Sequence, residues 1–175
     1  MMVRKQEGIH RPLTFGEVVL ARTVYGNLIN YSKVVVHCDS YLPFGLQSSD
    51  YGMTPNGELW FRSNLYRDDY SLERASLKHL FLHEMAHVWQ HQRGMWVRTR
   101  GLFSWAVAYR YKLDKSHLSD YGMEQQAAII ADYWYLKTQG INAFFAFRDR
   151  YYIGITDKTT LSAFKPIIKS AGLPL

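Results

Sequence analysis

The sequence predicts an α+β protein, mainly helical with a small sheet. Two long apolar stretches, residues 72–92 and 124–138, have a polar start and a glycine shortly after the end, as helices do. Two short stretches rich in β-branched and aromatic residues, 33–38 and 58–63, predict strands. No repeat, low-complexity tract or clear linker interrupts these elements, so residues 1–175 are expected to form a single domain.

The composition is typical of a folded domain. Of 175 residues, 47% are hydrophobic and 15% are aromatic, which suffices for one sizeable core and excludes an intrinsically disordered chain. The lone Cys38 excludes an internal disulfide. No apolar run approaches the length of a membrane span, and the N-terminal residues lack the apolar core of a secretory signal. We therefore expect a protein made in the cytoplasm, without a signal peptide or membrane insertion.

The first helix is predicted from its N-terminal cap. Thr14 and Glu17 have the spacing of a capping box, which predicts a helix from there to about Val24. A β-branched strand follows at residues 33–38. Residues 39–56 are rich in proline and glycine and predict a long loop.

The second strand, over residues 58–63, has alternating side chains. Leu59 and Phe61 are expected on one face and Trp60 on the other. Its position directly before the helix over 72–92 leaves two roles open. It can pair with an extended peptide substrate along its edge, or it can be an ordinary strand of the sheet.

The helix over residues 72–92 has signals at both ends. Asp69 or Ser71 can cap its N-terminus, and Glu73 lies in its first turn. Arg93 and then Gly94 mark its end. The residues between are strongly apolar, so the helix is expected to be buried.

The most informative residues of this helix form the pattern His-Glu-x-x-His. Residues four apart lie on one helix face, so His83 and His87 can bind the same ion. Glu84 lies beside them, where a carboxylate can hold and deprotonate a water molecule. Ionisable groups on a buried helix cost several kcal/mol unless they are paired or bind a metal. The pattern predicts a hydrolytic zinc site; the alternative is a set of structural histidines hydrogen-bonded in the core.

His79 and His91 extend this ladder of histidines by one turn in each direction. One helix cannot supply three ligands here, because the outer histidine of any three lies about 12 Å along the axis from the far one. Only His83 is followed directly by a glutamate. The central pair is therefore preferred, and the outer pair is expected to face solvent or to support the ligands.

The third ligand of a catalytic zinc must come from another element, since such an ion normally has three protein ligands and an open position. The pattern with a third histidine after a glycine fails, because Gln90 and Arg93 occupy those positions. Glu124 is the best candidate, because it opens the second long helix and small residues follow it on nearly the same face. These small residues, which allow a close approach to the first helix, are Ala127, Ala128 and Ala131.

Two alternatives to Glu124 as a ligand remain open. Glu124 can simply favour the positive N-terminus of its own helix. Asp132 is the other candidate ligand, although its place between Ile130 and Tyr133 better suits a hydrogen-bonding partner of a histidine.

Three further helices are expected, at residues 103–112, 142–149 and 159–170. Much of the net charge of +6 falls between the two long helices, where tyrosines interleave with basic residues, as in some nucleic-acid-binding surfaces. No nucleic-acid-binding motif is present, so no nucleic-acid partner is expected. The basic residues are Arg93, Arg98, Arg100, Arg110, Lys112 and Lys115.

Two stretches carry a resemblance to a known family. Residues 82–90, LHEMAHVWQ, and 121–127, YGMEQQA, resemble the gluzincin-like metallopeptidase effector domain of bacterial type VI secretion. That domain occurs fused to VgrG spike proteins or as a separate Vgr-related chain. Residues 12–17 and 34–37 are similar to its opening, so the resemblance spans about residues 10–150. The chain departs from the wider gluzincin pattern at Ala128, where an aspartate often supports the first histidine.

The resemblance implies a zincin-like fold and a zinc-dependent metallopeptidase. Zn²⁺ would be held by His83, His87 and Glu124, with the two helices packed together. Glu84 would be the base for a metal-activated water that hydrolyses a peptide bond. Candidates for the oxyanion donor, on sequence proximity alone, are Tyr109, Tyr111 and Tyr121.

The resemblance also implies an antibacterial toxin delivered by a type VI secretion system. Its partners would be a peptide or protein substrate, a secretion spike and an immunity protein, and it would act in the periplasm of a target cell. Two other interpretations remain open: a cytosolic minimal gluzincin that processes a regulatory protein, and a non-catalytic metal-binding adaptor module.

Overall fold

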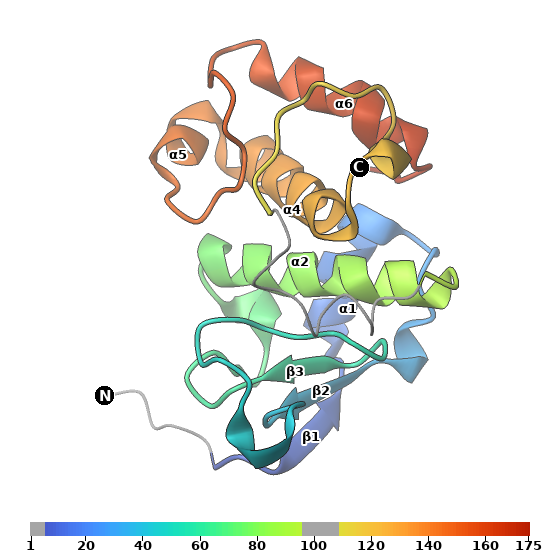
Figure 1. Cartoon of the computed structure of the whole chain (residues 1–175), viewed down its shortest axis with the longest axis vertical. Helices are drawn as coiled ribbons and strands as arrows, with labels where there is room; N and C mark the ends of the chain where they lie inside the picture. Colours follow the sequence, from blue (N-terminus) through green and yellow to red (C-terminus); the bar gives the residue numbers. More distant parts are fainter. Residues whose placement is uncertain (1–5, 96–108) are drawn as a thin grey trace.

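The computed structural model describes residues 6–95 and 109–175. A small sheet lies on one side of the molecule and the C-terminal helices lie on the other, with the long helix α2 (Ala75–Gln92) between them (Figure 1). The architecture is α+β and mainly helical with a three-stranded sheet, as the sequence predicts. None of the helices described here is both long and apolar enough to span a bilayer.

The sheet contains β1 (Ile9–Pro12), β2 (Val35–Cys38) and β3 (Leu59–Phe61), in that order. β1 and β2 are antiparallel, whereas β2 and β3 are parallel. Leu59 and Phe61 are fully buried and Trp60 lies on the outer face, so the predicted alternation is confirmed. β1 was not predicted, because a four-residue strand that ends in proline has almost no sequence signature.

The edge of β3 is occupied by the chain itself. Met53, from the long loop, pairs antiparallel with Trp60 through two backbone hydrogen bonds of 3.0 and 2.8 Å. β3 is therefore a strand of the sheet with its outer edge paired at Trp60, and pairing of an extended substrate with it stays a prediction. The loop over residues 39–56 is otherwise irregular, as predicted, apart from one 3-10 turn at Pro43–Gly45.

The first helix, α1 (Phe15–Tyr25), begins with the predicted capping box. The Glu17 backbone N–H donates to Thr14 Oγ1 at 3.0 Å, and the Thr14 N–H donates to Glu17 Oε2 at 2.9 Å. The Glu17 carboxylate is fully buried and also accepts two hydrogen bonds of 2.8 Å from Arg11. This ion pair ties β1 to the start of α1.

Helix α2 begins three residues later than predicted. Asp69 accepts a hydrogen bond from the Ser71 N–H and so caps a 3-10 turn at Tyr70–Leu72, not α2. Glu73 is extended, with φ −85° and ψ 166°, which separates that turn from the helix. At the other end Gly94 has φ +81°, so the predicted glycine stop is confirmed.

The C-terminal half contains α4 (Met123–Gln139), α5 (Ile141–Ala146) and α6 (Thr160–Ser170). The predicted alanines of α4 have no exposed surface, and α4 packs directly on α2. Helix α5 is shorter than predicted. The Thr159 hydroxyl donates to Asp157 and does not cap α6.

Part of one predicted helix can be compared with the structure. Residues 103–108 of the helix predicted over 103–112 lie outside the described residues, as do Arg98 and Arg100. Its described end is not helical, because Tyr111 pairs with Tyr152 of the later chain in an isolated parallel bridge.

Candidate metal centre

The three polar residues of the predicted pattern lie in the buried middle of α2. His83, Glu84 and His87 are only 6, 4 and 4% exposed. Apolar residues surround them on α2, because the helix has the sheet on one side and α4 on the other (Figure 1). The fold therefore takes three ionisable groups out of water, and each needs a partner.

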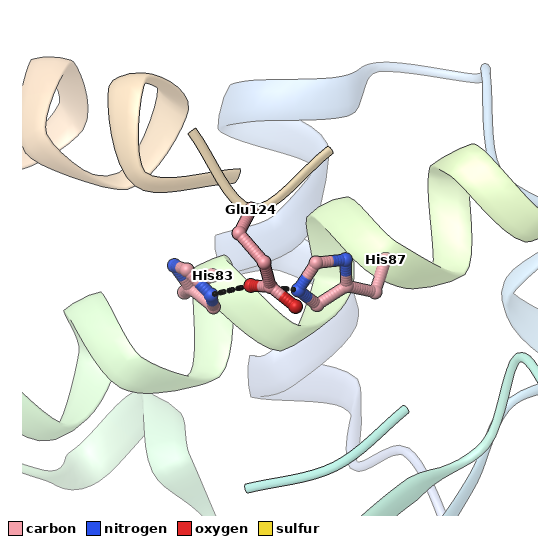
Figure 2. A group of neighbouring side chains, drawn as sticks. All are labelled: His83, His87 and Glu124. Carbon is pink, nitrogen blue, oxygen red and sulfur yellow. Dashed lines mark hydrogen bonds and ion pairs between the residues drawn. The ribbon is translucent and has the colours of Figure 1, made fainter. Parts of the chain in front are cut away.

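Glu124, in the first turn of α4, is the partner of the two histidines. Its Oε2 atom lies 2.9 Å from His87 Nε2 and 3.2 Å from His83 Nε2 (Figure 2). One ligand atom from each of these residues lies within 4.8 Å of the others, so the group could hold a metal ion. The structure thus brings together the three residues that the sequence predicts as ligands.

The tautomer of His87 is fixed by a chain of side-chain amides. Gln126 Nε2 donates to the Tyr121 carbonyl at 2.8 Å, so Gln126 Oε1 faces Gln90. Gln90 Nε2 donates to Gln126 Oε1 at 3.2 Å and to the Met123 carbonyl at 2.9 Å. Gln90 Oε1 must therefore accept from His87 Nδ1–H, at 2.8 Å. This leaves the lone pair of His87 Nε2 for a cation.

The negative charge of Glu124 also favours a cation between the imidazoles and the carboxylate. Burial opposes ionisation of Glu124, but attraction to His87 and hydrogen bonds from both histidines outweigh it and hold the pKa of Glu124 well below its usual value. Burial likewise lowers the pKa of His87, but the Glu124 charge outweighs it and raises this pKa to about 9. A proton fills the role when no metal is bound.

The geometry and chemistry of the group suit zinc. In a tetrahedral zinc site with bonds of 2.0–2.1 Å, neighbouring ligand atoms are about 3.3 Å apart. The two observed N···O distances, 2.9 and 3.2 Å, need only a small expansion to reach this value. Two imidazoles and one carboxylate are also a ligand set that zinc accepts.

His83 lacks the outer partner that His87 has. Its Nδ1 is buried and has no hydrogen-bond partner among the described residues. The residue four after Glu124, where the wider gluzincin pattern often has an aspartate, is the fully buried Ala128. This chain thus has alanine where an aspartate often supports the first histidine, and Nδ1 of that histidine has no partner among the described residues.

Glu84 is held against the loop that pairs with β3. Thr54 Oγ1 donates to Glu84 Oε2 at 2.7 Å, and both residues are buried. Gly52 permits the approach, because a Cβ there would lie 2.7 Å from Glu84 Oε1 and 2.8 Å from Phe61. Thr54 therefore engages one carboxylate oxygen of Glu84 and leaves the other without a hydrogen bond from the described residues.

Asp132, the alternative ligand, lies on α4 about two turns after Glu124 and is not part of the metal group. Its Oδ1 lies 2.8 Å from Nε2 of His79, which is buried and not solvent-facing. Its Oδ2 accepts from the Tyr111 hydroxyl at 2.7 Å and from the backbone N–H groups of Tyr151 and Tyr152, both at 3.1 Å. Asp132 is thus a partner of a histidine, as expected, but not of a predicted ligand.

Two tyrosines line the metal group. The ring of Tyr151 lies 5.8 Å from that of His83, Tyr109 lies 6.3 Å from it, and the two tyrosine rings stack at 5.5 Å. Burial and then the charges of Glu124 and Glu84 raise the pKa of Tyr109; burial and Glu84 also raise that of Tyr151. Both phenols therefore stay protonated and can donate.

The other two tyrosines suggested by the sequence are engaged elsewhere. The Tyr111 hydroxyl donates to Asp132, and the Tyr121 hydroxyl accepts from the Lys115 N–H at 3.0 Å. Sequence reasoning missed Thr54 and Tyr151, which lie in irregular segments far from the histidines along the chain. Gln90 could have been found, because it lies three residues after His87 on the same helix face.

Comparisons with known proteins place the chain among secretion effectors. No family model matches it. It is 41% identical over 138 residues to the type VI secretion system spike protein VgrG2b of Pseudomonas aeruginosa PAO1. That match covers 74% of this chain but only 13% of VgrG2b. The solved structure of the effector domain of Pseudomonas aeruginosa VgrG2b aligns with a TM-score of 0.65 and 34% identity, over 85% of this chain and 87% of that one. The chain therefore belongs to the family of the type VI secretion effector domain of VgrG2b.

Proposed function

We propose that this chain is a zinc-dependent metallopeptidase of zincin-like fold that acts as a type VI secretion toxin. The observation that carries the proposal is that His83, His87 and Glu124 converge from two helices. Glu84, next to His83 in the chain, is buried and is not one of these three candidate ligands. A structural metal site needs ligands only. A hydrolytic site also needs a base. Glu84 can be that base, because it is a second buried carboxylate and Thr54, from the loop, donates a hydrogen bond to it.

The residues of the chain divide the chemistry among them. Zinc, when bound by the three ligands, supplies a Lewis acid that polarises a carbonyl and makes water more acidic. Glu84 accepts the proton of the attacking water and passes it to the leaving amine. Thr54 orients Glu84 for this transfer, since it binds one oxygen and leaves the other for the proton. Tyr109 and Tyr151 donate to the developing oxyanion from the His83 side of the group.

The family context supports a delivered effector. A spike protein carries this domain in VgrG2b, so the secretion spike is the first partner that we propose for the chain. The substrate would be a peptide or protein of the target cell. An immunity protein in the producing cell and a periplasmic site of action complete the proposal.

Paired substitutions of the two glutamates test the catalytic part. Glu84→Ala should keep the fold and bind zinc with unchanged affinity, yet lose peptidase activity and toxicity. Glu124→Ala should lose both zinc and activity. Glu58→Ala is the matched control, because Glu58 also pairs with a histidine, His37, but lies outside the group. Full toxicity of the Glu84→Ala variant would exclude a peptidase and favour an adaptor module.

The place of action is tested by expression with and without a periplasmic export signal. We expect growth arrest of a sensitive bacterium only when the wild-type chain is exported, and none with Glu84→Ala. Growth arrest that requires the cytosolic form would instead favour processing of a regulatory protein.

A further inference from the structure

A second candidate site is formed by chain neighbours of Tyr109 and Tyr151 and shares no residue with the metal centre. An open pocket of about 330 Å³ lies between the chain around residue 110 and the segment that follows α5. Its lining is dominated by arginines and consists of Arg110, Arg148, Arg150, Tyr152, Ile153 and Gly154. Among the residues that the structure describes, no acidic side chain lines it.

The walls of the pocket are fixed by hydrogen bonds. The Tyr111 N–H donates to the Tyr151 carbonyl at 3.3 Å, and the Ile153 N–H donates to the Tyr111 carbonyl at 3.1 Å. These bonds join the two segments in a short parallel bridge. The buried Asp132 holds the N–H groups of Tyr151 and Tyr152 from below. The backbone next to the arginines, at residue 111 and residues 151–153, is therefore held by hydrogen bonds.

Arg150 is oriented by the end of α5. One of its terminal nitrogens, Nη1, donates to the carbonyls of Phe145 and Phe147 at 2.6 and 2.7 Å. Its Nε is buried and has no partner among the described residues. Its other terminal nitrogen, Nη2, forms no hydrogen bond with the described residues, so it is the donor that remains for a ligand, and a guanidinium held in this way loses little freedom when it binds.

Arg110 and Arg148 have exposed side chains that form no hydrogen bond or ion pair in the part of the chain that the structure describes. Three guanidinium groups around one pocket repel one another, and no carboxylate within the described ranges offsets this repulsion by pairing with them. An anion in the pocket would relieve the repulsion and satisfy the free donors.

We propose that this pocket binds an oxyanion group, either a phosphate or a carboxylate of a ligand. Arginine forks bind both groups through paired N–H···O bonds, and three arginines line this pocket. The site is independent of any metal, because none of its residues belongs to the metal group. It is a binding site of its own, one residue along the chain from the tyrosines that line His83.

The test is a titration of the purified full chain, with the amides of Ile153 and Gly154 followed by NMR at constant ionic strength. Inorganic phosphate is the probe in one arm and glutarate is the probe in the other, so that the two sources of the oxyanion are distinguished. Arg110→Gln and Arg148→Gln are the test variants, since neither side chain has a described bond whose loss would disturb the fold. Lys165→Gln, an exposed residue on α6, removes the same charge elsewhere and is the control.

We expect saturable shifts at Ile153 and Gly154 with at least one probe. Each arginine variant should weaken binding about tenfold, as expected for loss of a charge-assisted hydrogen bond. The Lys165→Gln variant should bind like the wild type. No saturable shift with either probe would overturn the proposal, as would equal weakening in all three variants, which would indicate only a general effect of net charge.

Discussion

At the scale of single residues, Gln90 sets which nitrogen of His87 faces the metal group with a lone pair. Its amide is oriented by the Met123 carbonyl and by Gln126, and it accepts from His87 Nδ1–H. The residue has no exposed surface. A glutamine in this place therefore does for His87 what a carboxylate or backbone carbonyl does in many zinc sites.

Replacement of Gln90 by leucine should weaken metal binding. The Gln90→Leu variant removes the acceptor for His87 Nδ1–H, so the ring is free to adopt the other tautomer, and we expect zinc affinity to fall about 10–100-fold. Competition with a chromogenic chelator measures this. Gln139→Leu, at the exposed end of α4, is the control. Unchanged affinity in Gln90→Leu would show that the tautomer is set by another group.

Thr54 allows a similar test at the base. The Thr54→Val variant keeps the shape but removes the donor to Glu84 Oε2, so Glu84 loses its fixed orientation. On the proposed function we expect kcat/KM to fall about tenfold or more, the size of one hydrogen bond to a charged group. Zinc content should not change, and Thr54→Ser should restore the rate. A fully active valine variant would remove Thr54 from the mechanism.

At the scale of elements, α2 and α4 are joined by two carboxylates of α4 that meet three histidines of α2. Glu124 meets His83 and His87, and Asp132, about two turns further along α4, meets His79. The first contact forms the metal group. The second also anchors the segment that carries Tyr151. Small residues between the two acids let the helices approach closely enough for both.

Breaking the second contact should cost much stability. In the Asp132→Asn variant the buried His79 loses its charged partner and two backbone N–H groups face a weaker acceptor. We expect a loss of about 3 kcal/mol in the free energy of unfolding, measured by urea denaturation. Asp149→Asn, at an exposed aspartate, should change little. A double variant with His79→Gln should lose less than the sum of the two single variants; additivity would contradict direct coupling.

The same elements show how far the sequence could predict the fold and the site. Thr14 with Glu17, and His83 with His87, act over one helical turn, so their spacing alone predicts their geometry. Glu124 was predicted because it begins a helix whose alanines predict close packing. The prediction that Asp69 caps the long helix was wrong, because Asp69 caps a 3-10 turn before α2.

Thr54 and Tyr151, which reach the site from irregular segments, could not be predicted. Thr54 lies 30 residues before Glu84, and Tyr151 is held by an aspartate 19 residues earlier in the chain. Neither lies in a periodic segment. Their positions depend on two backbone pairings, that of Met53 with Trp60 and that of Tyr111 with Tyr152. No short sequence pattern predicts pairings between segments so far apart in the chain.

At the scale of the whole molecule, the metal group connects the two halves of the chain. Two of its members come from α2, which packs on the sheet, and the third comes from the C-terminal helices (Figure 1). An ion that binds only the folded chain stabilises it by mass action. Metal binding should therefore be visible as a change in global stability, whatever the catalytic activity of the protein.

We expect zinc at 100 times its Kd to stabilise the chain by about 2.7 kcal/mol. For a chain of this size that gain raises Tm by about 5–10 °C, measured by calorimetry with and without a chelator. Glu124→Gln should abolish the zinc-dependent rise, whereas Glu58→Gln should keep it. Asp132→Asn should start from a lower Tm but show the same rise, because its contact with His79 lies outside the metal group. If Asp132→Asn lost the rise and Glu124→Gln retained it, Asp132 would be the third ligand, and α4 would have to shift along α2 by about two turns to bring Asp132 to the place of Glu124.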